Sequence, residues 1–188
     1  MQVDRRTVIR ALGYWGLGAM ALTAAGTAGA TVVRAVSLEE LVKRSSSVLV
    51  GLPLERWAEW ARIGGTKRIV TLTRLRVEET VSGAEDSELL VRTLGGRIGD
   101  LGQLVDGEAE LRVGERSLLF SHRFEPGLSG VTAMAQGHYP FDLGSGEPRL
   151  VRSPRVATMV RSKSAAVAQL EGMTLRDAKS LVTKVRPR

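Results

Sequence analysis

The run from Ile69 to Val81, IVTLTRLRVEETV, constrains the fold of this chain more than any other stretch does. β-branched residues crowd it, and they fit a pleated, half-buried surface better than a helix. Its side chains alternate in character, so a strand would present two distinct faces. One face is predicted to hold Thr71, Thr73, Leu75 and Val77, and the other Leu72, Arg74, Arg76 and Glu78. Because a slip of one residue would bury the arginines, the register is expected to be fixed.

The next apolar run, Glu88–Leu94 (ELLVRTL), is predicted to be the antiparallel partner of that strand. The residues between the two runs, Ser82–Asp86, carry turn chemistry. The alternation breaks at Glu79–Val81, which predicts a bulge or the end of the strand. The centre of the fold is therefore expected to be a β-hairpin.

Further strands are expected on both sides of this hairpin because short apolar runs alternate with turn residues. They are Ser47–Leu54, Glu108–Val113, Arg116–His122, Val131–Gln136 and His138–Leu143, with Arg149–Arg152 pairing back. Helices are predicted after Ser37 and after Thr174, each with a capping-box pattern. Trp57 and Trp60 are expected to cover one end of a barrel, with ligand stacking and interfacial anchoring as alternatives. The predicted fold is mainly β: a small antiparallel barrel with short N-terminal and C-terminal helices.

The first thirty residues have the anatomy of an export signal. A basic start with Arg5 and Arg6 precedes the uncharged run 11–30, which ends in a small-residue cleavage motif at Ala28 and Ala30. The segment RRTVIR resembles the bacterial twin-arginine signal. The resemblance implies that the twin-arginine export machinery is a partner and that the domain crosses the membrane already folded.

An uncleaved membrane anchor is the alternative for residues 11–30, since twenty uncharged residues are about enough to span a bilayer. Removal of residues 1–30 would leave one domain of ordinary size. The expected organisation is a signal peptide at 1–30, a β-barrel domain at 36–152, and a basic linker with a C-terminal amphipathic helix at 153–188.

The composition argues against several classes of protein. The chain has no cysteine, which rules out a disulfide framework, thiolate chemistry and a Cys-ligated metal. Aromatic residues make up only 4% of the chain, so a stacking platform for bases or sugars is not expected. No cofactor and no nucleic-acid partner are predicted.

Positive charge is concentrated at the C-terminal end. Residues 149–188 carry ten Lys or Arg against two acidic residues, whereas residues 31–148 are net negative. This asymmetry favours a basic arm that binds an anionic surface, with a solvated helix and linker as the alternative. The candidate binding residues are Arg149, Arg152, Arg155, Arg161 and Lys163.

The glycine-dense stretch Gly95–Gly102 is a second, weaker binding candidate. Its glycines could cradle a phosphate, or Asp100, Asp106 and Glu108 could hold Ca²⁺. Neither spacing matches a P-loop or an EF-hand. Backbone permissiveness at a crossover between strands explains the glycines equally well.

The order of these segments carries a resemblance to a known group. A helix at LEELV precedes the strands VLVG and RVEETVSG, the GGxxG loop, VGERSLLF and a glycine-interrupted strand at AQGHYPF. The order resembles a widespread group of exported bacterial domains of unassigned function, over about residues 36–145. Its most specific part is Val113-Gly114-Glu115-Arg116 before Leu118-Leu119-Phe120. The resemblance implies an OB-like barrel of the netrin/protease-inhibitor type, although the N-terminal cysteine that netrin-like inhibitors use is not present here.

Catalytic candidates are few. His122 and His138 are the two histidines of the chain, and a grouping of Ser121, a histidine and Asp142 can be imagined. No nucleophile elbow of the G-x-S-x-G type is present. Two histidines and a carboxylate could also bind a metal, but no metal site is predicted.

The sequence therefore predicts a non-enzymatic binding module of the cell envelope or the secreted fraction. Its expected partner is an anionic envelope polymer or a protein. The alternative function is a small secreted hydrolase or metal-dependent enzyme that uses His122 or His138.

Overall fold

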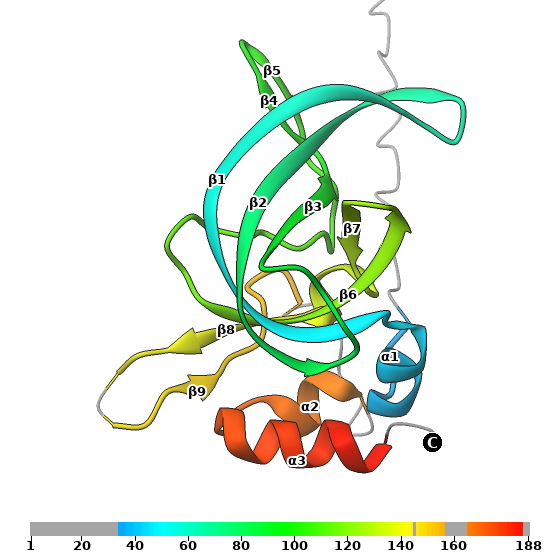
Figure 1. The fold of residues 1–188 in the computed structure, drawn as a ribbon. Helices are drawn as coiled ribbons and strands as arrows, with labels where there is room; N and C mark the ends of the chain where they lie inside the picture. Colours follow the sequence, from blue (N-terminus) through cyan, green and yellow to red (C-terminus); the bar gives the residue numbers. More distant parts are fainter. Residues whose placement is uncertain (1–33, 145, 157–164, 186–188) are drawn as a thin grey trace, which may run out of the picture. The chain divides into compact units, whose positions relative to one another are not determined.

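The computed structural model describes residues 34–144, 146–156 and 165–185. Its helices are α1 Leu38–Arg44, the 3₁₀ helix η1 Met134–Gly137, α2 Ala166–Leu170 and α3 Leu175–Val185. Its strands are β1 Ser47–Ile63, β2 Thr66–Ser82, β3 Glu88–Leu94, β4 Gly96–Ile98, β5 Leu101–Gln103, β6 Ser117–Glu125, β7 Leu128–Val131, β8 His138–Asp142 and β9 Arg149–Leu150. The described part of the chain is thus mainly β, as the sequence predicts (Figure 1).

The hairpin of β1 and β2 is the longest element of the fold. The two strands pair from Val48↔Ser82 to Ile63↔Thr66 around a turn at Gly64 and Gly65, whose φ angles of 57° and 80° suit glycine. The predicted alternation of β2 is confirmed from Thr73 to Glu78, although Leu72 is buried as well, and the pairing of β2 with β3 is confirmed. Register shifts opposite Val48–Gly51 confirm the irregularity expected near the end of β2.

The first strand is longer than the sequence suggests. The predicted end at Leu54 is wrong, because β1 continues to Ile63 after a register shift beyond Pro53. Trp57 and Trp60 therefore lie within β1, where they are 40% and 43% exposed. A strand that pairs along its whole length tolerates a proline at a bulge.

The strand pairings form a closed circuit. β1 pairs with β2, β2 with β3, β3 with β7, β7 with β6, and β6 again with β1 (Figure 1). Four of these pairings are antiparallel, but β3 and β7 are parallel, which differs from the all-antiparallel arrangement expected. The reason is geometric: a closed circuit of five strands is odd, so its neighbours cannot all alternate in direction. The sheet continues from β6 through β8 to β9.

Two predicted strands are not strands in the structure. Glu108–Val113 is irregular, although Ala109 and Leu111 are buried as an alternating pattern requires. The chain meets β1 only just after this segment, through one hydrogen bond from the Gly114 N–H to the Pro53 carbonyl, and no ladder forms. The other predicted strand that is not one is Val131–Gln136. Only Val131 belongs to a strand, and the chain then enters η1.

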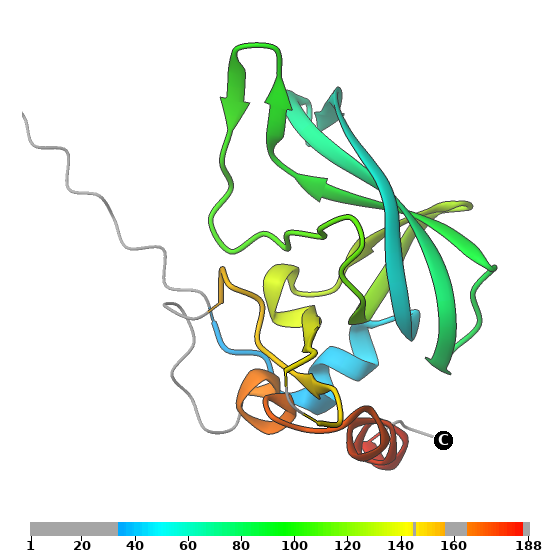
Figure 2. The ribbon, with the colours of Figure 1, turned by 90° about the vertical axis from the view of Figure 1, so that its left-hand side faces the viewer.

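Buried side chains form two clusters on opposite faces of β1 and β6. One cluster lies inside the circuit of strands and includes Leu49, Leu75, Leu89, Val91, Leu119 and Val131. The other joins Val48, Val50, Leu118, Phe120 and Tyr139 to the helices. The helices gather at one end of the strands, and the β4–β5 hairpin projects at the other (Figures 1 and 2).

The C-terminal helices pack on this second cluster. Thr174 caps α3, since its Oγ1 accepts a hydrogen bond from the Asp177 backbone N–H at 3.2 Å. Ala178 and Val182 of α3 are fully buried. The helices therefore belong to the core of the domain.

Candidate binding cleft

A cleft of about 230 Å³ opens beside β3, β7 and β6, where the far end of β1 approaches them. Its walls contain Ile63, Arg92, Leu94, Glu108, His122, Phe124, Gly130, Val131 and Met134. The strand register explains part of this set, because Arg92 pairs with Gly130 across β3 and β7, and His122 pairs with Gly130 across β6 and β7. Side chains in such a row point to one face of a sheet. Arg92 and His122 therefore reach the cleft from the two strands that flank β7.

The ring of Phe124 lies over the bare backbone of Gly130. A Cβ atom at Gly130 would stand 2.7 Å from two carbons of that ring and 2.9 Å from Cε1 of His122. His122 meets the edge of Phe124 with ring centroids 4.5 Å apart. The Arg92 guanidinium lies 4.2 Å from the centroid of Phe124. A side chain at position 130 would therefore shift the rings of Phe124 and His122 from this arrangement.

Arg92 has no acidic partner among the described residues. Other arginines of the sheet do: Arg74 pairs with Glu55 and Glu88, and Arg116 pairs with Glu78. Arg92 is half-buried beside apolar side chains, where an uncompensated cation is unfavourable. Its N–H donors are therefore available to a ligand.

His122 is half-buried in the same cleft. Burial lowers its pKa, and the positive charges of Arg44 and Arg92 lower the pKa further. The imidazole is accordingly neutral at physiological pH and can donate one hydrogen bond and accept one.

Glu108 forms the far wall and is held by the backbone. Its two carboxylate oxygens accept hydrogen bonds from the backbone N–H groups of Leu94 and Ala109, both at 3.0 Å. Burial raises its pKa, while these hydrogen bonds oppose the rise. The carboxyl group thus fixes the segment after β5 against the end of β3.

The turn beneath the cleft is strained. Ala133 and Met134 have φ angles of 56° and 57°, in the left-handed region that residues with a side chain rarely adopt. Such strain costs on the order of 1–3 kcal/mol per residue and is concentrated at functional sites. Met134 contributes directly to the cleft wall.

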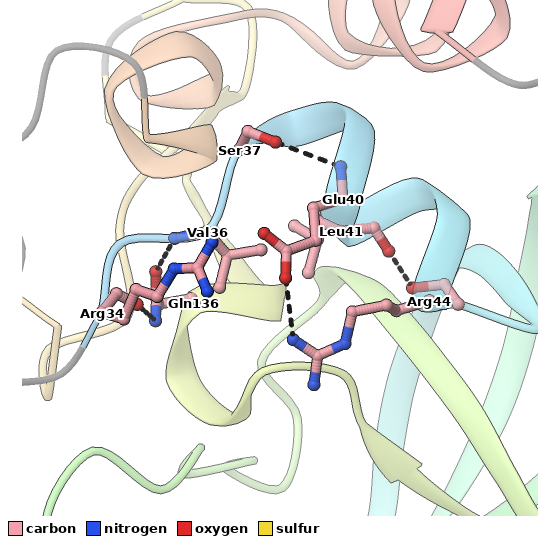
Figure 3. A network of polar contacts seen from close by, with 8 residues as sticks. Arg34, Val36, Ser37, Glu40, Leu41, Arg44 and Gln136 are labelled. Carbon is pink, nitrogen blue, oxygen red and sulfur yellow. Dashed lines mark hydrogen bonds and ion pairs between the residues drawn. The ribbon is translucent and has the colours of Figure 1, made fainter.

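Hydrogen bonds from the N-terminal segment hold this turn (Figure 3). Gln136 accepts a hydrogen bond from the Val36 backbone N–H at 2.9 Å and donates one to the Arg34 carbonyl at 3.0 Å. Ser45, at the end of α1, contacts the hydroxyl of Thr132 at 3.0 Å. The predicted cap of α1 is confirmed, since Ser37 Oγ accepts from Glu40 N at 3.2 Å.

The other catalytic candidates are not brought together with His122. His138 is buried and lies 3.2 Å from the hydroxyl of Ser153. Ser121 faces away from His122 and contacts Ser47 at 2.7 Å. The Asp142 side chain instead accepts a hydrogen bond from Gly144. Within the described ranges, no group of three or more His, Cys, Asp or Glu side chains could hold a metal ion.

The candidate basic residues make contacts within the domain. Arg149 donates to the Gly172 carbonyl at 2.7 Å, and Arg152 pairs with Glu171 at 2.6 Å. Arg155 lies 3.9 Å from Glu110. Arg161 and Lys163 lie outside the described residues, as do the signal residues Arg5, Arg6, Ala28 and Ala30.

The glycine-dense stretch is a short hairpin rather than an open loop. Gly96–Ile98 pairs with Leu101–Gln103 around a turn at Gly99, and a second cleft of about 230 Å³ lies beside it. Asp100 is exposed at the tip, whereas Glu108 is bound to the backbone. This geometry does not assemble the three carboxylates considered for Ca²⁺.

Sequence reasoning identified His122 but missed Arg92 and Phe124. The sequence does contain one signal, a glycine inside an apolar strand at Gly130, which marks a close approach of another group. Which side chain approaches Gly130 depends on the order of the strands in the sheet, and this order cannot be read from the sequence.

Comparisons with known proteins leave the family open. No protein-family model matches the chain, and no curated protein matches it. None of the helices in the described part of the chain has the length and apolar character that a membrane span requires.

Proposed function

We propose that this protein is an exported, non-enzymatic binding module built on an OB-like barrel. The closed pairing of β1, β2, β3, β7 and β6 supports the barrel, because an OB fold is a five-stranded, partly open barrel. OB folds present one outer sheet face and its bordering loops to their ligands. The cleft beside β3, β7 and β6 occupies such an outer face.

One observation carries the proposal: Arg92 is held half-buried against Phe124 with no acidic partner among the described residues. A protein that needed Arg92 only for stability would gain by pairing it or by exposing it. The strained turn at Met134 and the bare backbone at Gly130 both serve the same cleft. Each of these features has a cost for folding, and ligand binding accounts for all of them together.

Binding is favoured over catalysis by the side chains that line the cleft. No Ser, Thr, Cys or Lys is among the described lining residues, so no ordinary nucleophile is in place. His122 makes ring contact with Phe124 and has no hydrogen-bonded carboxylate among the described residues to orient it as a base.

Export is part of the proposal, and its support is the sequence of residues 1–30. The native protein should be found outside the cytoplasm with a mature terminus near Thr31, which intact mass and fractionation would measure. Replacing Arg5 and Arg6 by Lys should abolish export. A full-length cytoplasmic protein would contradict this part of the proposal, and a full-length membrane-bound one would support the anchor formed by residues 11–30.

Binding is tested separately by thermal shift with small anions, cations and neutral amphiphiles. At least one class should raise the Tm of the native protein, because a ligand that binds the folded state stabilises it. The Arg92→Gln variant should lose the shift, whereas Arg97→Gln, on the exposed β4–β5 hairpin, should retain it. If no class gives a shift that depends on Arg92, the proposal for the cleft is wrong.

A further inference from the structure

We infer that the cleft binds a small monocarboxylate with a compact apolar body, preferably one that contains a ring. The inference rests on the proposed function, since it names the ligand class of the same cleft. It is drawn from the charge, the shape and the hydrogen-bonding capacity of the lining side chains.

The charge of the cleft favours an anion. One face of the Arg92 guanidinium is occupied by Phe124, so its N–H groups remain free along the edge of the plane. A planar carboxylate matches this edge with two parallel hydrogen bonds, an arrangement that is stronger than a neutral contact. Low polarity around the pair strengthens the attraction further.

The rest of the wall favours an apolar body. Ile63, Leu94, Val131 and Met134 add aliphatic and thioether surface to the lining of the cleft. Met is an adaptable contact for an aromatic ring. A ligand that is charged throughout would leave this surface without a partner, whereas an aryl or branched alkyl group would cover it.

The size of the cleft indicates how much of a ligand it can hold. Its volume is about 230 Å³, and an engineered apolar cavity of about 150 Å³ in another protein holds benzene. The space therefore suits one ring with a short carboxylate arm.

The polar groups opposite Arg92 do not favour a cation. Both oxygens of Glu108 are already engaged by the N–H groups of Leu94 and Ala109. His122 makes no hydrogen bond among the described residues and can donate a second hydrogen bond to the carboxylate. The cleft thus offers free donors, and its one carboxylate is held by the backbone.

The test is a titration of the full-length protein, or of its mature form, with three probes that share one ring and chain length. They are 3-phenylpropionate, 3-phenylpropan-1-ol and 3-phenylpropylamine, and backbone amide NMR shifts report binding. The carboxylate is expected to bind with a Kd of about 1 mM or tighter, and the alcohol at least about tenfold more weakly because it lacks the charge. The largest shifts should fall on Arg92, His122 and Phe124.

Variants localise the binding. Arg92→Gln should weaken the carboxylate at least about tenfold and leave the alcohol unchanged, whereas Arg97→Gln should change neither. Gly130→Ala, which displaces Phe124, should weaken both probes. Circular dichroism of each variant establishes whether it is folded. Where a variant is unfolded, Phe124→Leu is measured in its place.

The outcomes separate the two proposals. Equal or tighter binding of the amine or the alcohol in the cleft would overturn the ligand class and leave the binding module intact. Carboxylate binding that is unchanged in Arg92→Gln would overturn the assignment of Arg92 as the anchor. If none of the probes binds and the thermal-shift panel is also silent, the proposed function itself fails.

Discussion

Gly51 of β1 lies directly beneath the side chain of Leu75 on β2. A Cβ atom at Gly51 would stand 2.3 Å from Cδ2 and 2.7 Å from Cγ of that leucine, which is fully buried inside the circuit of strands. Gly51→Ala should therefore lower the free energy of unfolding by about 1–3 kcal/mol through overpacking. Urea denaturation measures the effect. Gly102→Ala is the control, because nothing lies within 4 Å of that position, and an equal loss there would refute the explanation.

The burial of His138 makes stability depend on pH. Burial, aided by the charge of Arg112, lowers its pKa from 6.5 to about 4. In the unfolded chain His138 therefore binds a proton near pH 6.5, whereas in the folded protein it does so only near pH 4. The free energy of unfolding therefore falls as the pH falls through this window. The loss should approach about 3 kcal/mol.

Denaturant unfolding between pH 4 and pH 7 measures this dependence. Because Glu108 and other carboxyl groups also titrate, the informative quantity is the difference in slope between the native protein and His138→Asn. The native protein should lose more stability toward pH 4 than the variant does. Parallel curves would show that His138 takes up its proton at the same pH in the folded and unfolded chains, which would contradict the lowered pKa.

The hydroxyl of Tyr139 is buried and has no hydrogen-bond partner among the described residues. Its ring packs edge-on against Phe120, with centroids 6.0 Å apart. Tyr139→Phe keeps that packing and removes a desolvated polar group, so it should raise stability by about 1 kcal/mol. Ser47→Ala should do the opposite, because the Ser47 hydroxyl contacts Ser121 and Glu85. A lower Tm for Tyr139→Phe would indicate that the hydroxyl has a partner.

Gln136 uses both halves of its amide to hold the N-terminal segment against the turn at the cleft. Gln136→Glu keeps the acceptor for Val36 N–H but sets an oxygen against the Arg34 carbonyl. It should cost about 1–3 kcal/mol and speed hydrogen exchange at Val36. Gln103→Glu is the matched control, since Gln103 acts as an acceptor for Ile69 N–H at 2.9 Å and a carboxylate can replace it. Equal costs in the two variants would mean that the donor half of Gln136 is unimportant.

Much of the local structure was predictable from the sequence. The alternation from Thr71 to Glu78 identified the face of β2 that holds Thr73, Leu75 and Val77, and the strand β3 has the predicted bounds. The caps at Ser37 and Thr174 were also correct. These features depend on residues within a few positions of one another, so local chemistry specifies them.

The candidate site was only partly predictable. His122 was a candidate on its residue type alone, but its neighbours Arg92 and Phe124 were not. Arg92 reaches the cleft because β3 pairs in parallel with β7, where its partner is Gly130, 38 residues later. No sequence pattern within β3 or β7 predicts that the two strands pair.

The sequence by itself determined the β2–β3 hairpin, the caps of α1 and α3 and the buried side of β2, because periodicity and capping act over short distances. The tertiary structure decided the order of the strands, the full length of β1 and the left-handed turn at Ala133 and Met134. It also decided that Arg92, Phe124 and His122 share one cleft. These outcomes depend on contacts between distant parts of the chain, whose free energies are settled only when the whole core packs.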